Sequence, residues 1–229
     1  MEAIVLAGGL GTRLAARLNG IPKPMAAVGG RPFLEILLGQ LQRAGCTRAV
    51  LAVGHLHEAI QGHFGASFHG MRVDYAVEDY PLGTGGAIRN ALTLAEDESV
   101  VVLNGDTFLD ADYADMLRFH AAHAGQITIA ITRHAEIARY GGVRLRGERI
   151  TGFEEKGRTG EGWINAGSYV LAKRLEWPAS LPERFSFERD FLMPEITRLS
   201  PAAYRVEGFF LDIGVPQDLD RAQTELAGF

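Results

Sequence analysis

Short apolar runs alternate with helix-like stretches along the first two-thirds of the chain. Runs of aliphatic and β-branched residues predict strands at 3–6, 49–53, 71–77, 99–103 and 126–132. Apolar residues spaced three and four positions apart predict helices at 32–43, 57–64, 85–94 and 112–123. Alternating strands and helices are typical of a parallel sheet with helices on both faces. We therefore predict an α/β fold built on a mixed, mostly parallel sheet.

The pattern changes after Tyr140. Turn residues there separate short predicted strands at 143–145, 149–154 and 163–171, and helices are predicted at 188–199 and from 216 onward. These strands indicate a β-rich part that packs on the sheet. Because no linker, repeat or low-complexity stretch divides the chain, we expect one domain over 1–229, with one part at about 1–135 and a second at about 136–229.

Composition and charge exclude several classes of protein. The 229 residues are 47% hydrophobic and 22% charged, with a formal net charge of −5. This mild acidity argues against general nucleic-acid binding, and no apolar run reaches the roughly 18–20 residues that span a bilayer. The single cysteine excludes an internal disulfide. We expect a cytoplasmic protein without a signal peptide, because the N-terminus enters a strand directly and has no basic leader. The sequence is compatible both with a monomer and with a homo-oligomer.

A glycine-rich loop directly follows the first predicted strand. Residues Gly8 to Arg13 read GGLGTR, and glycines at these positions let backbone N–H groups approach an anion closely. The loop differs from the dinucleotide fingerprint because Leu14 stands at the third glycine position, and it differs from the P-loop because no Lys-Ser or Lys-Thr pair follows. Two cations lie nearby, Arg13 within the loop and Lys23 between two prolines. This arrangement suits a triphosphate together with a second phosphate.

Two aspartates offer oxygen ligands for a cation. Asp106 follows the carboxyl end of a buried strand, which is where open α/β sheets bind their ligands. Asp212 lies in the apolar sequence Leu-Asp-Ile-Gly. Two carboxylates combined with phosphate oxygens match Mg²⁺, which keeps several waters and needs only one or two carboxylates.

With these motifs, the chain resembles the sugar-1-phosphate nucleotidylyltransferases over nearly its whole length. The loop GGLGTRL is followed by PKP, and then PLGTGGAI, LNGD, RYGG, FEEKG, INAGSYVL and LDIGVP occur in the family's order. One departure is that Ala-Arg-Leu at 16–18 stands where many members have Pro-Leu-Thr. The bacterial D-glycero-α-D-manno-heptose-1-phosphate guanylyltransferases share this departure, and they are the branch that the chain resembles most.

This resemblance implies a Rossmann-like fold of the nucleotide-diphospho-sugar transferase type, with the β-rich part as a sugar-binding insertion. It implies catalytic roles for Arg13, at the leaving pyrophosphate, and for Lys23, at the attacking phosphate, with Mg²⁺ on Asp106 and Asp212. The residues implied in nucleotide binding are Leu6, Ala7, Gly8, Gly9, Gly11, Thr12, Glu78, Gly83 and Thr84. Those implied in sugar-phosphate binding are Tyr140, Gly141, Glu155, Lys156, Asn165 and Gly167.

Glu78 favours GTP as the nucleotide. A carboxylate can accept two parallel hydrogen bonds from the N1–H and 2-amino groups of guanine, whereas adenine offers no such pair and uracil offers one donor. A glutamate also occurs in members that use pyrimidine nucleotides. We therefore expect transfer of GMP from GTP to D-glycero-α-D-manno-heptose 1-phosphate, giving GDP-heptose and pyrophosphate for a bacterial capsule or surface polysaccharide.

Other functions stay open at this point. The first is mannose-1-phosphate guanylyltransferase, followed by another NTP:sugar-1-phosphate transferase such as a uridylyltransferase. A non-catalytic subunit that senses a nucleotide sugar belongs to a different class, but the presence of Arg13, Lys23, Asp106 and Asp212 favours an enzyme. A sugar phosphate is close to a dianion at neutral pH, so we expect direct in-line attack on the α-phosphate without a general base.

Overall fold

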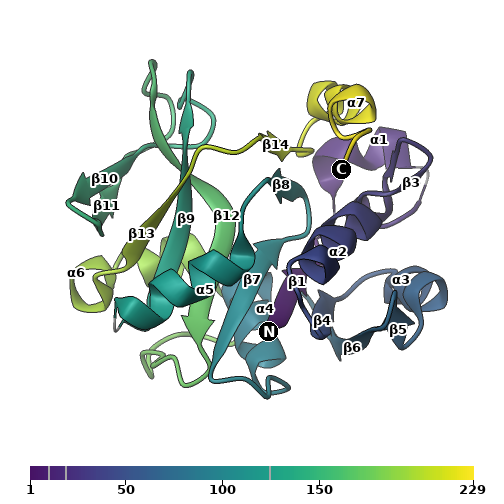
Figure 1. Cartoon of the computed structure of the whole chain (residues 1–229), viewed down its shortest axis with the longest axis horizontal. Helices are drawn as coiled ribbons and strands as arrows, with labels where there is room; N and C mark the ends of the chain where they lie inside the picture. Colours follow the sequence, from purple (N-terminus) through teal and green to yellow (C-terminus); the bar gives the residue numbers. More distant parts are fainter. Residues whose placement is uncertain (10, 19, 124) are drawn as a thin grey trace.

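One sheet of ten strands runs through the computed structural model, which describes residues 1–9, 11–18, 20–123 and 125–229 (Figure 1). Across the sheet, the strands follow the order β10 (Val143–Arg146), β11 (Arg149–Phe153), β13 (Ala202–Val206), β9 (Ile127–His134), β12 (Gly162–Ala172), β7 (Ser99–Asn104), β1 (Glu2–Leu6), β4 (Arg48–Val53), β6 (Met71–Val77) and β5 (Ser67–Phe68). Strands β11, β12 and β5 run opposite to the other strands. The prediction of a mixed, mostly parallel sheet is therefore confirmed.

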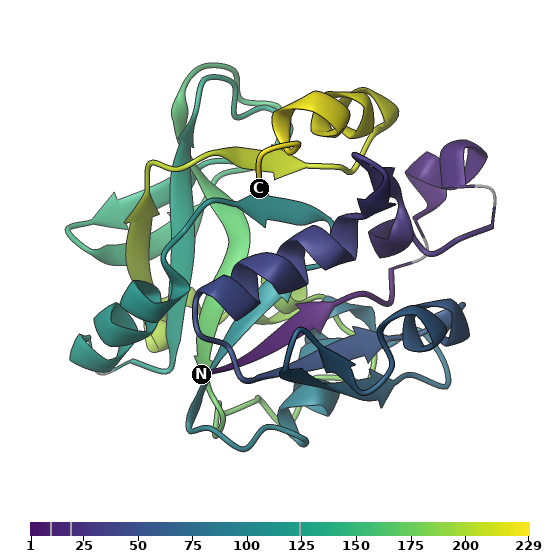
Figure 2. The same cartoon turned by 45° about the vertical axis from the view of Figure 1, so that its right-hand side comes forward.

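Helices cover both faces of this sheet, and in Figure 2 the dark blue helix α2 runs beside the purple strand β1. One face carries α2 (Phe33–Arg43), α3 (His57–Phe64), α5 (Tyr113–Ala122) and α7 (Pro216–Glu225), and the other carries α4 (Gly83–Leu92), the π-helix η3 (Phe187–Leu192) and α6 (Ile196–Leu199). Alternate residues of the central strands enter the two cores. In β7, Val101 and Leu103 pack in the first core, and Val100 and Val102 pack in the second. Because both faces are buried, β7 is apolar at successive positions rather than at every second one.

Short elements surround the main sheet near the carboxyl ends of β1 and β7. They are η1 (Thr12–Leu14), α1 (Ala15–Leu18), η2 (Lys23–Met25), the pair β2 (Ala27–Val28) and β3 (Arg31–Pro32), and the pair β8 (Thr107–Leu109) and β14 (Phe210–Asp212). In the last pair, Asp212 lies opposite Thr107. This register brings Asp212 close to Asp106, although the two residues are far apart in the sequence.

The predicted strands and helices before Tyr140 are present with bounds that agree within two residues. The prediction of a continuous helix at 188–199 is wrong, because that segment forms η3 and then, after a turn, the short α6. Pro194 lies in the turn, where it lacks an N–H group and restricts the residue before it, so it disfavours an unbroken helix. The later strands extend the central sheet instead of packing on it, with β12 between β9 and β7. Within the described residues, no helix has the length and apolar character needed to cross a membrane.

Candidate functional site

Three adjoining cavities lie at the carboxyl ends of β1 and β7. The first cavity, of about 170 Å³, is lined by Leu6, Gly8, Gly9, Ala52, Glu78, Pro81, Gly83, Thr84 and Ala87. The second, of about 180 Å³, shares Leu6, Gly9 and Thr84 with the first and adds Lys23, Pro24, Asn104, Gly105 and Asp106. The third, of about 360 Å³, shares Asn104 and Asp106 with the second. The shared walls place the cavities in one row.

Glu78 forms one side of the first cavity, immediately after β6. Its Oε2 accepts a hydrogen bond of 3.0 Å from the Leu82 N–H, and burial raises the pKa of this carboxyl above its usual value. A partly desolvated carboxylate gains from a ligand that donates hydrogen bonds. Gly83 has a φ of +70°, and an added Cβ would lie 2.6 Å from the Phe185 carbonyl oxygen, so a larger residue cannot fit there unstrained.

Lys23 and Asp106 meet in the second cavity. Lys23 is 7% exposed at the start of η2, and its Nζ lies 2.5 Å from Asp106 Oδ2. Gly105 lets the turn after β7 lie directly against the end of β1, since an added Cβ would be 2.3 Å from the Leu6 carbonyl oxygen. This close approach brings the carboxylate to the lysine that follows the glycine-rich loop.

The structure places other loop residues outside these cavities. Arg13, in η1, is exposed and is not among the residues that line them. Ala7 and Gly11 are not among the lining residues either, and Gly11, with a φ of +60°, packs against Lys23. The backbone of Thr12 lies in η1, whereas Leu10 and the side chain of Thr12 lie outside the described part of the chain.

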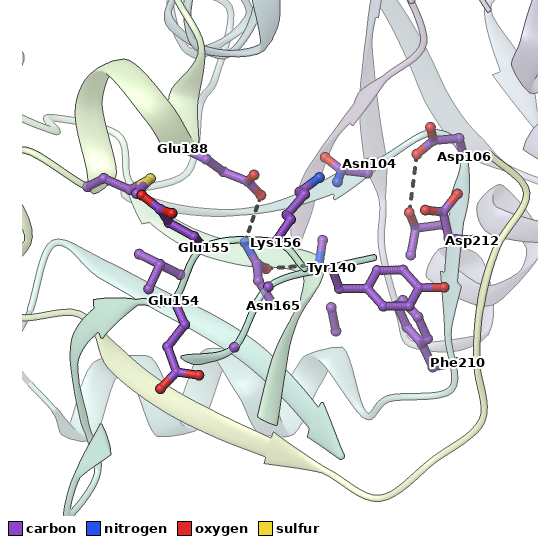
Figure 3. Close-up of a pocket in the computed structure, with 17 residues that line it drawn as sticks. Asn104, Asp106, Tyr140, Glu154, Glu155, Lys156, Asn165, Glu188, Phe210 and Asp212 are labelled. Carbon is purple, nitrogen blue, oxygen red and sulfur yellow. Dashed lines mark hydrogen bonds between the residues drawn. The ribbon is translucent and has the colours of Figure 1, made fainter. Parts of the chain in front are cut away.

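Asp106 and Asp212 line the third cavity together (Figure 3). Burial, and next the charge of Asp106, raise the pKa of Asp212 above its usual value. The Gly214 N–H donates to Asp212 Oδ1 at 2.5 Å, and Arg139 Nη2 lies 3.3 Å from Asp212 Oδ2. Two carboxylates that repel each other in one partly buried cavity fit a hard divalent cation such as Mg²⁺. The described residues hold no group of three or more His, Cys, Asp or Glu arranged for a metal, so substrate or water oxygens would complete the coordination.

All six residues predicted to bind the sugar phosphate line the third cavity, namely Tyr140, Gly141, Glu155, Lys156, Asn165 and Gly167. The ring of Tyr140 packs edge-on against Phe210 at 5.5 Å between centroids. Gly167 has a φ of +70°, and an added Cβ would lie 2.6 Å from Asn104 Nδ2. The third cavity therefore combines an aromatic wall with carboxylate, amide and ammonium groups.

The residues near the site that the sequence analysis did not assign include Asn104, Arg139 and Glu188. Asn104 lies in the motif LNGD with Asp106, and Arg139 lies in the motif RYGG with Tyr140. Both could therefore have been assigned to the site from the sequence. Glu188 carries no local signal, because only the fold brings η3 to the cavity. Glu188 accepts hydrogen bonds from Asn165 and Tyr169, and Figure 3 shows the first of these.

Comparisons with known proteins agree with this arrangement. The model of the nucleotidyl transferase family matches residues 2–228. The D-glycero-alpha-D-manno-heptose 1-phosphate guanylyltransferase of Aneurinibacillus thermoaerophilus is 41% identical over 99% of this chain and 98% of its own length. The mannose-1-phosphate guanylyltransferase of Mycobacterium tuberculosis is 31% identical over 99% of this chain and 64% of its own length. The crystal structure of HddC from Yersinia pseudotuberculosis complexed with GMP-PN is 34% identical, with a TM-score of 0.85 over 98% of this chain and 99% of that chain.

Proposed function

The chain belongs to the nucleotidyl transferase family, and on that premise we propose that it transfers GMP from GTP to D-glycero-α-D-manno-heptose 1-phosphate with release of pyrophosphate. Its membership in the family confirms the resemblance that the sequence motifs predict. The relative named as a heptose 1-phosphate guanylyltransferase is similar over nearly the full length of both chains, which supports this sugar. The observation that carries the proposal is the row of three cavities, because it offers a nucleoside, a phosphate and a sugar site in the order in which the product joins them.

We assign the first cavity to guanosine, the second to the phosphates and the third to the sugar. Glu78 would accept hydrogen bonds from guanine N1–H and the 2-amino group in the first cavity. Most of the third cavity is formed by residues after Tyr140, whereas the first is formed by residues between Leu6 and Ala87. This supports a nucleotide-binding part at about 1–135 and a sugar-binding part at about 136–229.

The chemical difficulty of this reaction is the repulsion between two phosphate groups. The attacking phosphate is already ionised, so the protein has to position it in line and neutralise charge. Lys23 lines the second cavity together with Gly9 of the glycine-rich loop and Asp106, and its ammonium group would neutralise the charge of the phosphate oxygens. Asp106 and Asp212 would hold Mg²⁺, which would supply positive charge at the transferred phosphate. Arg13, exposed in η1, would meet the leaving pyrophosphate.

Mannose 1-phosphate is the second candidate substrate, because a mannose-1-phosphate guanylyltransferase matches 99% of the chain at 31% identity. The same chemistry would serve both sugars, which differ in one carbon of the side chain. We also propose that the enzyme works in the cytoplasm, where GTP is available, and that its product feeds a surface polysaccharide.

The proposal is tested by measuring pyrophosphate release with each of the four NTPs against the heptose, mannose and glucose 1-phosphates, with and without a chelator of divalent metals. We expect turnover with GTP and the heptose 1-phosphate, abolished by the chelator. Lys23→Met should lose this activity, whereas Lys173→Met, a matched control beyond the end of β12, should keep it. A kcat/KM for mannose 1-phosphate equal to that for the heptose 1-phosphate would favour the second candidate substrate. Nucleotide binding without any turnover would refute the proposal that the protein is an enzyme.

A further inference from the structure

A hydrogen-bonded chain of side chains, at the wall of the third cavity and in the core behind it, ends in one carboxylate oxygen. Asn165 Nδ2 donates to Glu188 Oε1 at 2.8 Å and to the hydroxyl of Tyr169 at 2.9 Å. The Tyr169 hydroxyl in turn donates to the same Glu188 Oε1 at 2.8 Å. Glu188 Oε1 therefore accepts two hydrogen bonds from β12, and Glu188 itself lines the cavity (Figure 3).

The amide of Asn165 is engaged within the protein. Its Oδ1 accepts a hydrogen bond of 3.0 Å from the Gly167 N–H, and both of its N–H groups are used toward Tyr169 and Glu188. An amide side chain has two N–H donors, so Asn165 has none left for a sugar hydroxyl. The geometry makes Asn165 a support for Glu188.

Tyr169 supports the same carboxylate from within the core. The residue is 2% exposed, and burial, followed by the charge of Glu188, raises the pKa of its phenol well above the usual value. The phenol consequently stays protonated and remains a donor to Glu188 at neutral pH. Two fixed donors on one oxygen hold the plane of the carboxylate and leave its other oxygen, Oε2, without a protein donor among the described residues.

The backbone of η3 is anchored in the core and fixes the position of Glu188. Phe187 and Phe191 are fully or almost fully buried on either side of it, and the Phe187 N–H donates to Thr84 Oγ1 at 2.9 Å. Ser186 caps this π-helix by accepting a hydrogen bond from the Arg189 N–H. π-Helical turns are rare and occur frequently at functional sites. Glu188 is therefore an exposed carboxylate on a buried, well-anchored segment.

We propose that Glu188 reads a ring hydroxyl of the sugar phosphate by accepting its hydrogen bond at Oε2, with Asn165 and Tyr169 as positioning residues; this inference rests on the proposed function. A sugar offers many O–H donors, and an ionised acceptor forms a stronger hydrogen bond with them than a neutral one. A site built to pair with a hydroxyl also rejects an analogue without it, because the polar group of the protein is then left unpaired. Glu188 thus determines which sugar phosphates are accepted.

The test compares Glu188→Gln with Glu195→Gln, a matched control in the same segment whose side chain pairs with Arg198. Kinetics are measured with GTP against mannose 1-phosphate, the heptose 1-phosphate and the monodeoxy mannose 1-phosphates. We expect Glu188→Gln to raise KM for both natural sugar phosphates about tenfold or more, with little change in kcat or in KM for GTP. Because Tyr169→Phe removes one of the two supporting donors, it should raise the same KM by a smaller factor.

The deoxy sugars identify the contact. For the one analogue that lacks the hydroxyl read by Glu188, the wild type and Glu188→Gln should have the same KM, whereas they should differ on the others. If the ratio of the two KM values is the same for every analogue, or if Glu195→Gln gives the same loss, the assignment is overturned. If the wild type turns over no sugar phosphate, the proposed function fails. In that case, calorimetry of mannose 1-phosphate binding to the wild type and to Glu188→Gln tests the sugar contact of Glu188 without turnover. Tenfold weaker binding by Glu188→Gln supports the assignment, and equal binding by both proteins overturns it.

Discussion

Replacing Lys23 by Met tests how the second cavity is held together. Lys23 is 7% exposed, its Nζ is 2.5 Å from Asp106 Oδ2, and Asp212 lies in the adjoining cavity. Loss of one partner of a fully buried ion pair costs about 3–5 kcal/mol. The Asp106 side chain is 34% exposed, so solvent reduces this cost, and we expect a loss of about 2 kcal/mol in the free energy of unfolding. For a protein of this size, this corresponds to a Tm lower by roughly 4–8 °C.

A second substitution separates stability from catalysis. Asp106→Asn in the Lys23→Met background removes the carboxylate that was left without its nearest cation, together with its repulsion of Asp212, so it should restore most of the stability. It should not restore turnover, because the loss of a charge contact to the transferred phosphate costs about two to three decades in kcat. The single and double variants therefore rank differently in the two measurements.

The assay is chemical unfolding of the wild type, both single variants and the double variant without divalent metal, together with pyrophosphate release by each. Lys173→Met controls for the loss of a lysine elsewhere and should match the wild type in both measurements. The Lys23–Asp106 pair does not have this role if Lys23→Met unfolds like the wild type, or if the double variant is no more stable than Lys23→Met.

Three further predictions concern other parts of the molecule. Gly83→Ala should lower stability by about 1–3 kcal/mol and raise KM for GTP, because of its positive φ and the contact with the Phe185 carbonyl oxygen; unfolding and kinetic measurements check both. Burial lowers the pKa of His120, so below about pH 6.5 the unfolded chain takes up a proton at this side chain that the folded protein does not. The free energy of unfolding should therefore fall as the pH drops through this range, and it should fall less steeply in His120→Gln. Urea titrations at several pH values check this. Arg139→Gln leaves Asp212 without its cation, so the metal-free Tm should fall and the rise in Tm on adding Mg²⁺ should exceed that of the wild type; an equal rise in both proteins would contradict this role.

The sequence by itself determined the elements of the α/β core. Strands that are buried on both faces, such as β7, need apolar residues at successive positions, and helices such as α2 need an apolar stripe. Both signals are local, so the period of the pattern is enough to find them. The glycine-rich loop and Lys23 were also found locally, because the loop directly follows β1 and Lys23 lies between two prolines that are adjacent to it in the sequence.

The arrangement of the second half was decided by the tertiary structure. Strand β12 lies between β9 and β7 because its pairing partners are distant in sequence, and no local pattern distinguishes insertion in a sheet from packing on it. The split of the predicted helix at 188–199 depends on the packing of Phe187 and Phe191 in the core as well as on Pro194. The short strand β14 has too few residues for a periodic signal, although it carries Asp212.

The site shows the same division. The chemistry of Asp106, Asp212, Tyr140 and Lys156 is visible in the sequence, because their types and motifs indicate phosphate, metal and sugar binding. Their meeting in one cavity, and the roles of Arg139 and Glu188, follow from the register of β14 with β8 and from the anchoring of η3. A residue type reports what a side chain can bind, whereas only the packing of distant segments determines which hydrogen-bonding groups are already used within the protein and which remain for a ligand.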